Sequence, residues 1–588
     1  MTWINGLISL VLLLSFLVGC RPPSQERVST PGVGMRIHDL QGCAHLSPYN
    51  GRLVEKIEGV VTKKTNSGFY LQDEQADDLE CSSEGIFVHT GEYPVVLPGD
   101  KVQVSGRVKE YYPGSESDNN LPITEIELEK VALASRGNPL PDAIVIGIGG
   151  RKIPESIVED DSFTSFDVDA DGLDFFESLE SMIVGVNSGI VVGPRNPYNE
   201  VVIIPQELLD RNLVSPDGAL MQTEVDLNPE RIMLNMNSTN IAKVDVGSRL
   251  SKPVMGILDY SYGNYKINTF GLVEFANPGS ERRTTNLPMG DLTIASYNVE
   301  NLSLDDERSK FVGIARNIVN DLKNPQVVIL HEIMDDSGIT DDGEVSASAT
   351  ISRLIDEIEG AGGPMYGYFD NPPKNNQDGG IEGGNIRSVM IYRQDQELRL
   401  VEAGLGKGMK SNPMRIGDDS GDFYGTRKPL VVLFATQNSK FLVIAAHLTS
   451  RGADSPIFGN VQPIEKPEEQ KRNLQARYIN HFAEEFLLKN PDSHVIISGD
   501  MNDDPWSNTI KELEGDHFTN MGRFLPSFEQ YSYILNGNAI QLDYILVSDK
   551  VKITDDSFWI SHTNSLHDYT SQISDHDVVL AVIQVESE

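Results

Sequence analysis

The stretch from about residue 288 onward constrains the fold most, because short apolar strands alternate there with segments of helical periodicity. Runs such as LTIASYN, QVVILHE, FLVIAAHL and HVIISGD read as buried strands, and helical periodicity occurs at 308–322, 347–359 and 468–488. Alternation of this kind is typical of α/β proteins. We therefore predict one α/β domain over residues 288–588.

Polar residues that a purely structural role does not require lie at the ends of these strands. Any one of them alone could form a turn or be a buried, hydrogen-bonded side chain. Carboxylates, amides and histidines that converge on one sheet edge are costly to bury without a ligand. The set therefore predicts a functional site, and it comprises Asn298, Glu332, His447, Asp500, Asn502, Asp543, Asp575 and His576.

The order of these residues resembles the endonuclease/exonuclease/phosphatase superfamily, the DNase I-like fold, over residues 291–588. The segments DDSGITDDGEVSAS, GGNIRSVMIYR, HLTSRGADSPIFGNVQP and RNLQARYINHF are similar to the bacterial extracellular nuclease branch of that superfamily. The resemblance implies a four-layered sandwich of two sheets flanked by helices. The sequence departs from the pattern at His331, where such nucleases have glutamine before the metal-binding Glu332.

The resemblance also implies hydrolysis of a phosphodiester bond with a divalent cation, Mg²⁺ first and Ca²⁺ or Mn²⁺ as alternatives. His576 would be the general base, and Asp543 would orient it. His447 would donate a hydrogen bond to the phosphate or the leaving oxygen. Asp500 and Asn502 would position the water and the phosphate. The residues that would hold the metal are Asn298, Glu332 and Asp575.

Further polar residues near these strands divide into substrate contacts and structural groups. The candidates for binding substrate are Asn385, Arg387, Arg427 and Arg472. The three arginines are candidate phosphate contacts because planar guanidinium groups suit phosphate oxygens. Ordinary surface salt bridging is the alternative for the arginines. Asp503 and Asp504 are expected to cap the following loop or helix, and we expect a solvated acidic loop at Asp335, Asp336, Asp341 and Asp342.

The first residues read as an export signal. An apolar run at 6–19 is short for a membrane span and stops at Cys20, and its ending LVGC looks like a bacterial lipobox. We therefore predict a signal peptide at 1–19, a lipidated Cys20 and a linker at 20–35. The chain would be an exported, membrane-anchored bacterial lipoprotein at the outer membrane, the cell surface or in the periplasm. Cys43 and Cys81 are then expected to pair, with two separate buried cysteines as the alternative.

Two β-rich modules are expected before the α/β domain. Residues 36–135 contain five β-rich runs with glycine punctuation, which resemble the oligonucleotide/oligosaccharide-binding (OB) barrel at the front of some extracellular nucleases. Its aromatic residues could stack bases or fill the core, namely Phe69, Tyr70, Phe87, Tyr111 and Tyr112. Residues 136–285 hold further strand-like runs and are predicted to form a second β-rich module.

One segment of the second module, DVDADGLDFFES at 167–178, partly matches a calcium-binding EF-hand loop. Asp167, Asp169, Asp171 and Gly172 fit its positions 1, 3, 5 and 6, but position 12 is Ser178 instead of the bidentate glutamate. We therefore interpret the segment as structural.

The charge balance narrows the class of partner. With 48 Lys+Arg against 87 Asp+Glu, the net charge is −39, which excludes a protein that holds nucleic acid or anionic lipid through a basic surface. Apart from the site carboxylates, the acids are expected on the surface. The predicted function is a lipid-anchored, metal-dependent nuclease that cleaves DNA with little sequence preference. The alternatives are another phosphodiesterase of the fold (sphingomyelinase-like), a phosphatase, or a non-catalytic surface binding lipoprotein.

Overall fold

The computed structural model describes residues 34–210, 214–236, 242–277, 289–394, 398–401, 408–554 and 556–585. The predicted signal peptide and Cys20 lie outside these ranges and stay predictions. No helix in the described part of the chain is both long and apolar enough to cross a membrane.

The first module is a closed five-stranded barrel, in the order β1-β2-β3-β5-β4. Its strands pair antiparallel except for β3 and β5, which run parallel. Alternate residues of β4, such as Val102, Val104 and Val108, point into the core, as the period of two in a strand requires. The elements are α1 (Ile37–Gln41), β1 (Leu53–Lys64), β2 (Gly68–Gln72), β3 (Gly85–His89), β4 (Lys101–Tyr111) and β5 (Ile123–Ser135).

The second module is built on a nine-stranded sheet, in the order β15-β12-β8-β9-β11-β14-β13-β7-β6. The helix α2 (Gly172–Glu177) packs its buried phenylalanines against this sheet. The strands are β6 (Ile144–Ile146), β7 (Ile183–Val186), β8 (Gly189–Gly193), β9 (Glu200–Pro205), β11 (Ile232–Asn235), β12 (Arg249–Leu250), β13 (Val254–Ser261), β14 (Asn264–Thr269) and β15 (Phe275–Ala276).

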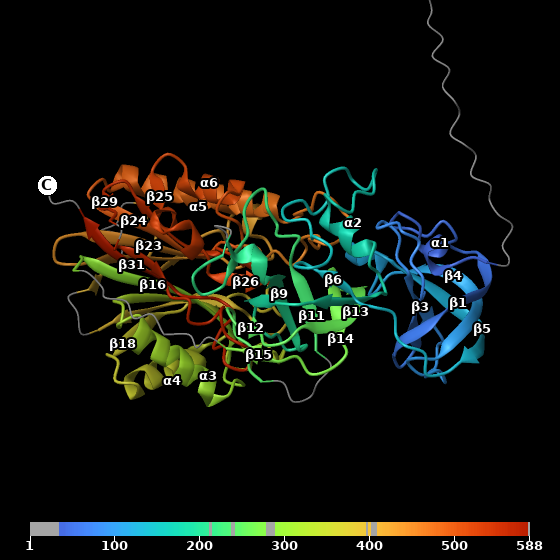
Figure 1. The fold of residues 1–588 in the computed structure, drawn as a ribbon. Coiled ribbons are helices and arrows are strands. Elements are labelled where there is room, and N and C mark those ends of the chain that lie inside the picture. Colours follow the sequence, from blue (N-terminus) through green and yellow to red (C-terminus); the bar gives the residue numbers. More distant parts are fainter. Residues whose placement is uncertain are drawn as a thin grey trace, which may run out of the picture.

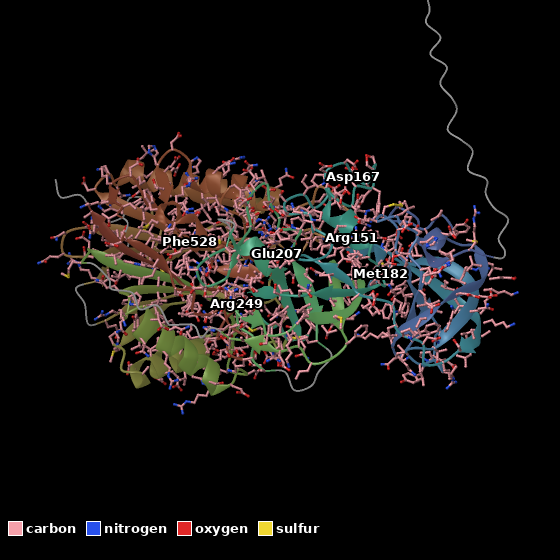
Figure 2. All side chains as sticks on the ribbon, viewed as in Figure 1. Arg151, Asp167, Met182, Glu207, Arg249 and Phe528 are labelled. Atoms are coloured by element: carbon pink, nitrogen blue, oxygen red, sulfur yellow. A yellow bond between two sulfur atoms is a disulfide. The ribbon has the colours of Figure 1, made fainter. Side chains whose placement is uncertain are left out.

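The barrel and the second module pack closely against each other. Tyr70 and Phe87 of the barrel form one apolar cluster with Ile183 and Ile257 of the second module, and Figure 2 labels Met182 at this junction. A Cβ at Gly85 would lie 2.4 Å from the backbone of Ser181, so only glycine permits the approach.

This packing decides the role of three predicted base-stacking residues. Phe69, Tyr70 and Phe87 are buried in the barrel core or at the junction, so the interpretation as core residues holds for them. Tyr111 is exposed.

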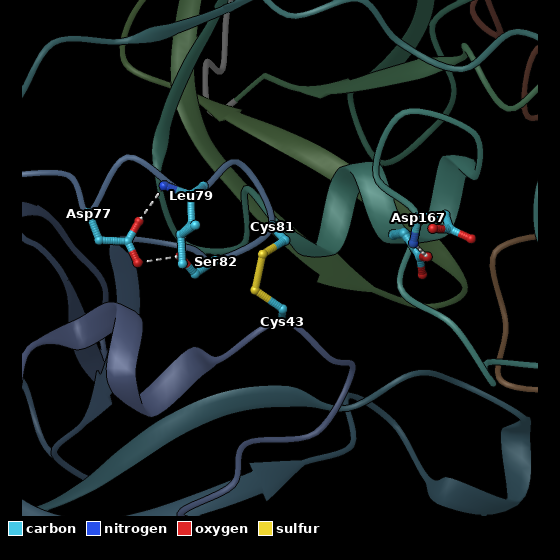
Figure 3. The surroundings of a disulfide bond; sticks show 7 residues. Cys43, Asp77, Leu79, Cys81, Ser82 and Asp167 are labelled. Carbon is cyan, nitrogen blue, oxygen red and sulfur yellow. Dashed lines mark hydrogen bonds between the residues drawn. A yellow bond between two sulfur atoms is a disulfide. The ribbon is translucent and has the colours of Figure 1, made fainter. Parts of the chain in front are cut away.

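The two cysteines of the barrel region are bonded to one another. The Sγ atoms of Cys43 and Cys81 form a disulfide that links the loop after α1 to the loop before β3 (Figure 3). The structure therefore has the predicted disulfide and not two separate buried cysteines.

The C-terminal domain has four layers, and its three apolar clusters show why. One cluster lies between the two sheets, a second between the first sheet and helices α3 and α4, and a third between the second sheet and helices α5 and α6. Figure 1 shows the helix pairs on opposite sides of the two sheets. The helices are α3 (Arg308–Arg316), α4 (Ser348–Gly360), α5 (Glu469–Lys489) and α6 (Asn508–Glu514).

Each sheet of this domain has seven strands in the described part of the chain. The first runs β18-β19-β17-β16-β31-β29 with β30 beside β31, and the second runs β20-β22-β23-β24-β28-β25 with β21 beside β22. The first contains β16 (Leu292–Leu302), β17 (Val327–Ile333), β18 (Tyr366–Phe369), β19 (Arg387–Arg393), β29 (Val551–Lys552), β30 (Phe558–Ile560) and β31 (Val579–Val585). The second contains β20 (Arg399–Leu400), β21 (Met414–Arg415), β22 (Leu430–Ala435), β23 (Lys440–His447), β24 (Ser493–Asp500), β25 (Phe518–Asn520) and β28 (Asp543–Ser548).

A small shared sheet joins the second module to the C-terminal domain. Strand β10 (Leu220–Met221) of the module pairs parallel with β27 (Asn538–Ile540), which pairs with β26 (Tyr533–Leu535). A buried ion pair adds to this junction: Arg195 donates Nε and Nη2 to the two carboxylate oxygens of Asp568, at 2.7 and 3.0 Å. The second module is therefore fixed beside the loops that carry the site.

Candidate active site

Strand register brings the predicted site residues to one edge of the two sheets. The parallel pair β16 and β17 places Asn298 opposite His331, directly before Glu332. The parallel pair β23 and β24 places His447 opposite Asp500, and β28 places Asp543 opposite Asp500 from the other side. The carboxyl ends of these parallel strands therefore meet where the sequence predicts the site.

An amide links two of the carboxylates. Asn298 Nδ2 donates to Glu332 Oε1 at 3.1 Å and to Asp500 Oδ2 at 3.2 Å. The hydroxyl of Ser574 donates to the Asn298 carbonyl at 2.7 Å, which ties in the loop that carries Asp575. Asp575 is close enough to raise the pKa of Glu332 through its charge.

Several site residues adopt left-handed backbone conformations. Non-glycine residues rarely have positive φ, yet φ is 61° at Glu332, 52° at Glu300, 55° at Asn301 and 51° at Asn502. The backbone N–H of Asn301 donates to Glu332 Oε2 at 3.1 Å, and the backbone N–H of Asn502 donates to Asp500 Oδ1 at 2.9 Å. Strained backbone of this kind clusters at functional sites, where it aims side chains.

The donor set of this cluster fits a divalent cation. Burial raises the pKa of Glu332, and burial together with the charge of Asp543 raises the pKa of Asp500 to about 6. Carboxylate and amide oxygens are the ligands that Mg²⁺, Ca²⁺ and Mn²⁺ prefer. A bound cation would offset the negative charge that burial leaves poorly solvated, so the residues Asn298, Glu332 and Asp575 fit the predicted metal site.

A histidine–aspartate pair lies beside the cluster. His576 Nδ1 is 2.8 Å from Asp543 Oδ2, and the Ser532 hydroxyl donates to the same oxygen at 2.8 Å. Burial disfavours protonated His576, but the carboxylates of Asp543, Asp575 and Asp500 outweigh this and raise its pKa well above the ordinary value. His576 Nε2 lies 3.9 Å from Asp500 Oδ2, so the second ring nitrogen faces the carboxylate cluster.

The second predicted histidine of the site faces the same carboxylates. His447 Nε2 lies 3.5 Å from Asp500 Oδ2 and 3.9 Å from Glu332 Oε1. Burial, with the charge of Arg427 next, lowers the pKa of His447 well below its ordinary value, so its imidazole is neutral. A neutral imidazole in this place can donate one hydrogen bond.

The unusual His331 is a structural residue. Its ring lies between two hydroxyls, with Nδ1 2.8 Å from Ser388 Oγ and Nε2 3.1 Å from Ser296 Oγ. Burial lowers its pKa to about 3. A neutral, hydrogen-bonded imidazole replaces the expected glutamine without adding charge to the site.

Of the four predicted phosphate contacts, Arg427 lies at the cluster. Its Nε donates to the His447 carbonyl at 3.4 Å, its Nη2 donates to the Leu448 carbonyl, and the charges of Glu332 and Asp500 act on it. Arg427 as a whole is half-buried.

The prediction for Arg472 is wrong. Arg472 is completely buried, and its Nε donates to Asp503 Oδ2 at 2.9 Å. Its ion pair is internal, so the alternative of a surface salt bridge is wrong as well. Asp503 also accepts from the Thr509 hydroxyl at 2.7 Å at the start of α6, and the buried Asp504 pairs with Arg451 and Lys466.

Asn385 and Arg387 also have internal partners. Asn385 Nδ2 donates to Asp335 Oδ2 at 2.8 Å, and Arg387 Nη1 lies 3.3 Å from Asp370 Oδ2. Both side chains are buried, and their hydrogen bonds hold the loop after Glu332 in place. The expected solvated acidic loop is partly wrong for the same reason, since Asp335 is buried.

A cavity of about 360 Å³ adjoins the site, and the sequence did not predict its walls. Glu300 could have been found from the sequence, because it closely follows Asn298 in the motif SYNVEN. No sequence motif connects Tyr533 or the second-module residues with the site. Tyr533 packs its ring 4.8 Å from that of His576. The lining includes Glu300, Tyr533 and Asp575 of the C-terminal domain and Arg195, Asn196 and Glu200 of the second module.

Comparisons with known proteins give two family matches and several structural ones. Residues 145–276 match a domain of unknown function (DUF8508), and no curated protein matches the chain. Similar solved structures include humanized D. rerio TDP2 (17% identity, TM-score 0.34, 50% of this chain and 99% of that chain). The human Nocturnin catalytic domain is 13% identical with a TM-score of 0.34, covering 50% of this chain and 94% of that chain.

An endonuclease/exonuclease/phosphatase from Bacteroides vulgatus is 12% identical with a TM-score of 0.34, covering 51% of this chain and 100% of that chain. The model of the Endonuclease/Exonuclease/phosphatase family matches residues 295–576, which contain every site residue described above from Asn298 to His576. This part of the chain therefore belongs to the Endonuclease/Exonuclease/phosphatase family.

Proposed function

We propose that the chain is a divalent-metal-dependent nuclease that hydrolyses phosphodiester bonds of DNA with little sequence preference. The observation that carries this proposal is the His576–Asp543 pair, 2.8 Å apart, beside the carboxylates that Asn298 links. Family membership supports a hydrolase of phosphodiester or phosphate bonds. DNA as the substrate rests on the similarity of the segments after Glu332 and His447 to extracellular nucleases.

Three carboxylates favour protonated His576, and a bound cation would offset two of them, Asp575 and Asp500. In the proposed reaction, neutral His576 then takes the proton of the attacking water through Nε2. Asp543 accepts the Nδ1–H of His576, which fixes the tautomer and leaves Nε2 as the base. The Ser532 hydroxyl holds Asp543 in place. Neutral His447 donates Nε2–H to a phosphate oxygen or to the leaving oxygen. Arg427 adds positive charge where the transition state becomes more negative.

Asn298, Glu332 and Asp575 would hold the metal, Mg²⁺ with Ca²⁺ or Mn²⁺ as alternatives. When bound, the ion would supply Lewis-acid stabilisation of the phosphate oxygens. Asp500 and Asn502 would orient the water and the phosphate, and the backbone N–H of Asn502 holds the Asp500 carboxylate. The chain carries a net charge of −39, so contact with a polyanion through such a cation suits it better than a basic surface does.

We also propose a lipid-anchored protein outside the cytoplasm, on the strength of the apolar run at 6–19 and Cys20. The barrel order 1-2-3-5-4, with the parallel pair β3 and β5, supports an OB-like front domain.

The test is cleavage of supercoiled plasmid and of a labelled oligonucleotide, with Mg²⁺ and with excess chelator. His576→Ala and Asp500→Ala should lower the rate by about 10²–10⁴. His517→Ala is the matched control, because His517 is an exposed histidine paired with Asp549. Full cleavage in chelator, or an undiminished rate in His576→Ala, would refute the mechanism. If the protein cleaves sphingomyelin or phosphate monoesters and leaves DNA intact, DNA is the wrong substrate and one of the alternative activities applies.

A further inference from the structure

The junction between the barrel and the second module contains a histidine surrounded by carboxylates. His45, in the loop before β1, has Nε2 2.7 Å from Asp174 Oδ1 and Nδ1 3.6 Å from Glu177 Oε2. One ligand atom from each of His45, Glu159 and Asp174 lies within 4.8 Å of the others. His45 belongs to the barrel region, whereas Glu159 and Asp174 lie close together in the sequence of the second module, and none of the three belongs to the cluster around Asp500.

The carboxylates here leave buried oxygen atoms without hydrogen-bond partners. Asp171 is only 3% exposed, and its Oδ1 has no partner. Glu159 accepts two backbone amides on Oε1, at 2.9 and 3.1 Å, whereas its Oε2 is buried without a partner. Burial, and then the charges of Glu159, Asp160 and Asp174, raises the pKa of the Asp171 carboxyl to about 7.

Charge at this junction is unbalanced. Asp174 and Glu177 contact His45 directly and a ligand atom of Glu159 lies within 4.8 Å, so three carboxylates surround one imidazole, which can carry a single positive charge. The rings of Phe163 and Phe166 pack edge-on against His45, at 4.9 and 5.3 Å between centroids. These rings restrict water, so the excess negative charge is poorly solvated.

We propose that His45, Glu159 and Asp174, with Asp171 beside them, bind a divalent transition-metal ion of the Zn²⁺ type. Imidazole and carboxylate together suit Zn²⁺ or Mn²⁺, whereas Ca²⁺ and Mg²⁺ prefer oxygen alone. The set differs from the EF-hand pattern in this region, because Asp167 and Asp169 are exposed and Asp167 uses its backbone amide to bind Asp174. Only Asp171 is common to both.

The bound ion would fasten the barrel to the second module. His45 lies two residues after Cys43, whose disulfide with Cys81 already restrains the same loop (Figure 3). Asp174 belongs to α2 of the second module, and Glu159 to the loop before it. An ion that binds only the folded junction raises the free energy of unfolding by RT ln(1 + [L]/Kd), where [L] is the free ion concentration.

The experiment measures Zn²⁺ binding and thermal unfolding of the metal-free full chain. Glu332→Gln with Asp575→Asn removes catalytic ligands, and this double variant should still bind one Zn²⁺ ion and show a rise in Tm. In the same background, His45→Gln and Glu159→Gln should weaken Zn²⁺ binding by at least about tenfold and abolish the rise. Asp169→Asn is the matched control, an exposed acid of the same segment, and should leave both unchanged.

Glu159→Gln keeps an oxygen that can accept the two backbone amides, so it tests the proposal if His45→Gln does not fold. A double variant that binds no Zn²⁺, or Glu159→Gln with the parental affinity, would overturn the proposal. Because the catalytic ligands are absent from this background, failure here leaves the proposed nuclease function untouched, and loss of DNA cleavage leaves this site untouched.

Discussion

Replacing Glu110 with glutamine should stabilise the protein at pH 8 and have no effect near pH 4.5. Glu110 lies at the end of β4 and accepts the Ser47 amide at 2.7 Å and the Thr124 hydroxyl at 3.3 Å. Burial, and then the charges of Glu177 and Glu125, raises the pKa of this carboxyl from 4.5 to about 7. The ionised form is therefore disfavoured in the folded state.

The magnitude and its sign follow from this pKa. A rise from 4.5 to about 7 corresponds to about 3 kcal/mol against the ionised form at high pH. Because Glu110 is partly accessible to water, we expect about 1–2 kcal/mol in practice. The folded state binds the proton more tightly, so the free energy of unfolding of the parent rises as the pH falls from 8 through 7 towards 4.5. Below that pH both states are protonated and the cost is absent.

Urea denaturation at pH 8 and at pH 4.5 measures the effect. Glu110→Gln keeps an oxygen for the Ser47 amide, so its gain should be present at pH 8 and disappear at pH 4.5. Glu129→Gln, at an exposed position of β5, is the matched control and should give no pH-dependent difference. Equal destabilisation by Glu110→Gln at both pH values would refute the reasoning, because it would mean that the side chain contributes through its hydrogen bonds and not through its charge.

Three further predictions concern the site and the junctions. Asp543→Asn retains an acceptor for Ser532 but loses the charge that orients His576, so kcat should fall by about 10²–10⁴ with KM nearly unchanged. Steady-state kinetics on an activated phosphodiester measure this change. A loss of kcat below threefold would contradict the prediction. Arg195→Ala leaves Asp568 buried without its partner and should lower the free energy of unfolding by about 3–5 kcal/mol, while Arg249→Ala on the same module, an exposed position labelled in Figure 2, should not. Replacing both Cys43 and Cys81 by serine opens a loop with a sequence separation of 38 and should cost about 3–4 kcal/mol in denaturant unfolding; an unchanged midpoint would show that the disulfide does not restrain the unfolded chain.

The sequence predicted the catalytic edge because strand ends are local features. A period of two marks a strand, the first polar residue marks its end, and parallel neighbours must bring those ends together. Asn298, His447 and Asp500 are aligned in this way. The same reasoning could not decide whether each arginine binds substrate phosphate or forms a salt bridge, because a guanidinium suits a phosphate and a carboxylate equally. Arg472 pairs with Asp503 and Arg427 faces the site only because of tertiary packing.

The second module's place at the site was also beyond sequence reasoning. Arg195 lies 373 residues from Asp568 in the chain, and no periodicity connects them. Their ion pair, with the shared sheet of β10, β27 and β26, places Asn196 and Glu200 in the wall of the cavity that Asp575 also lines. Any substrate that reaches Asp575 through this cavity must pass the second module, so that module belongs to the design of the active site.

The sequence suggested that the acids behind the net charge of −39 lie on the surface, apart from the site carboxylates. The structure buries several others. Burial raises the pKa of Glu110, Asp171 and Glu180 at the barrel junction and of Asp500 and Asp543 at the catalytic edge. A buried carboxylate with a raised pKa destabilises the folded state when it is ionised, and either a proton or a metal ion removes that cost. Part of the excess acid therefore lies where the two proposals place cations, at the catalytic edge under the proposed function and near His45 under the further proposal. On this reasoning the metal-free chain should be least stable at high pH, and divalent cations should restore at pH 8 what protonation provides at pH 5.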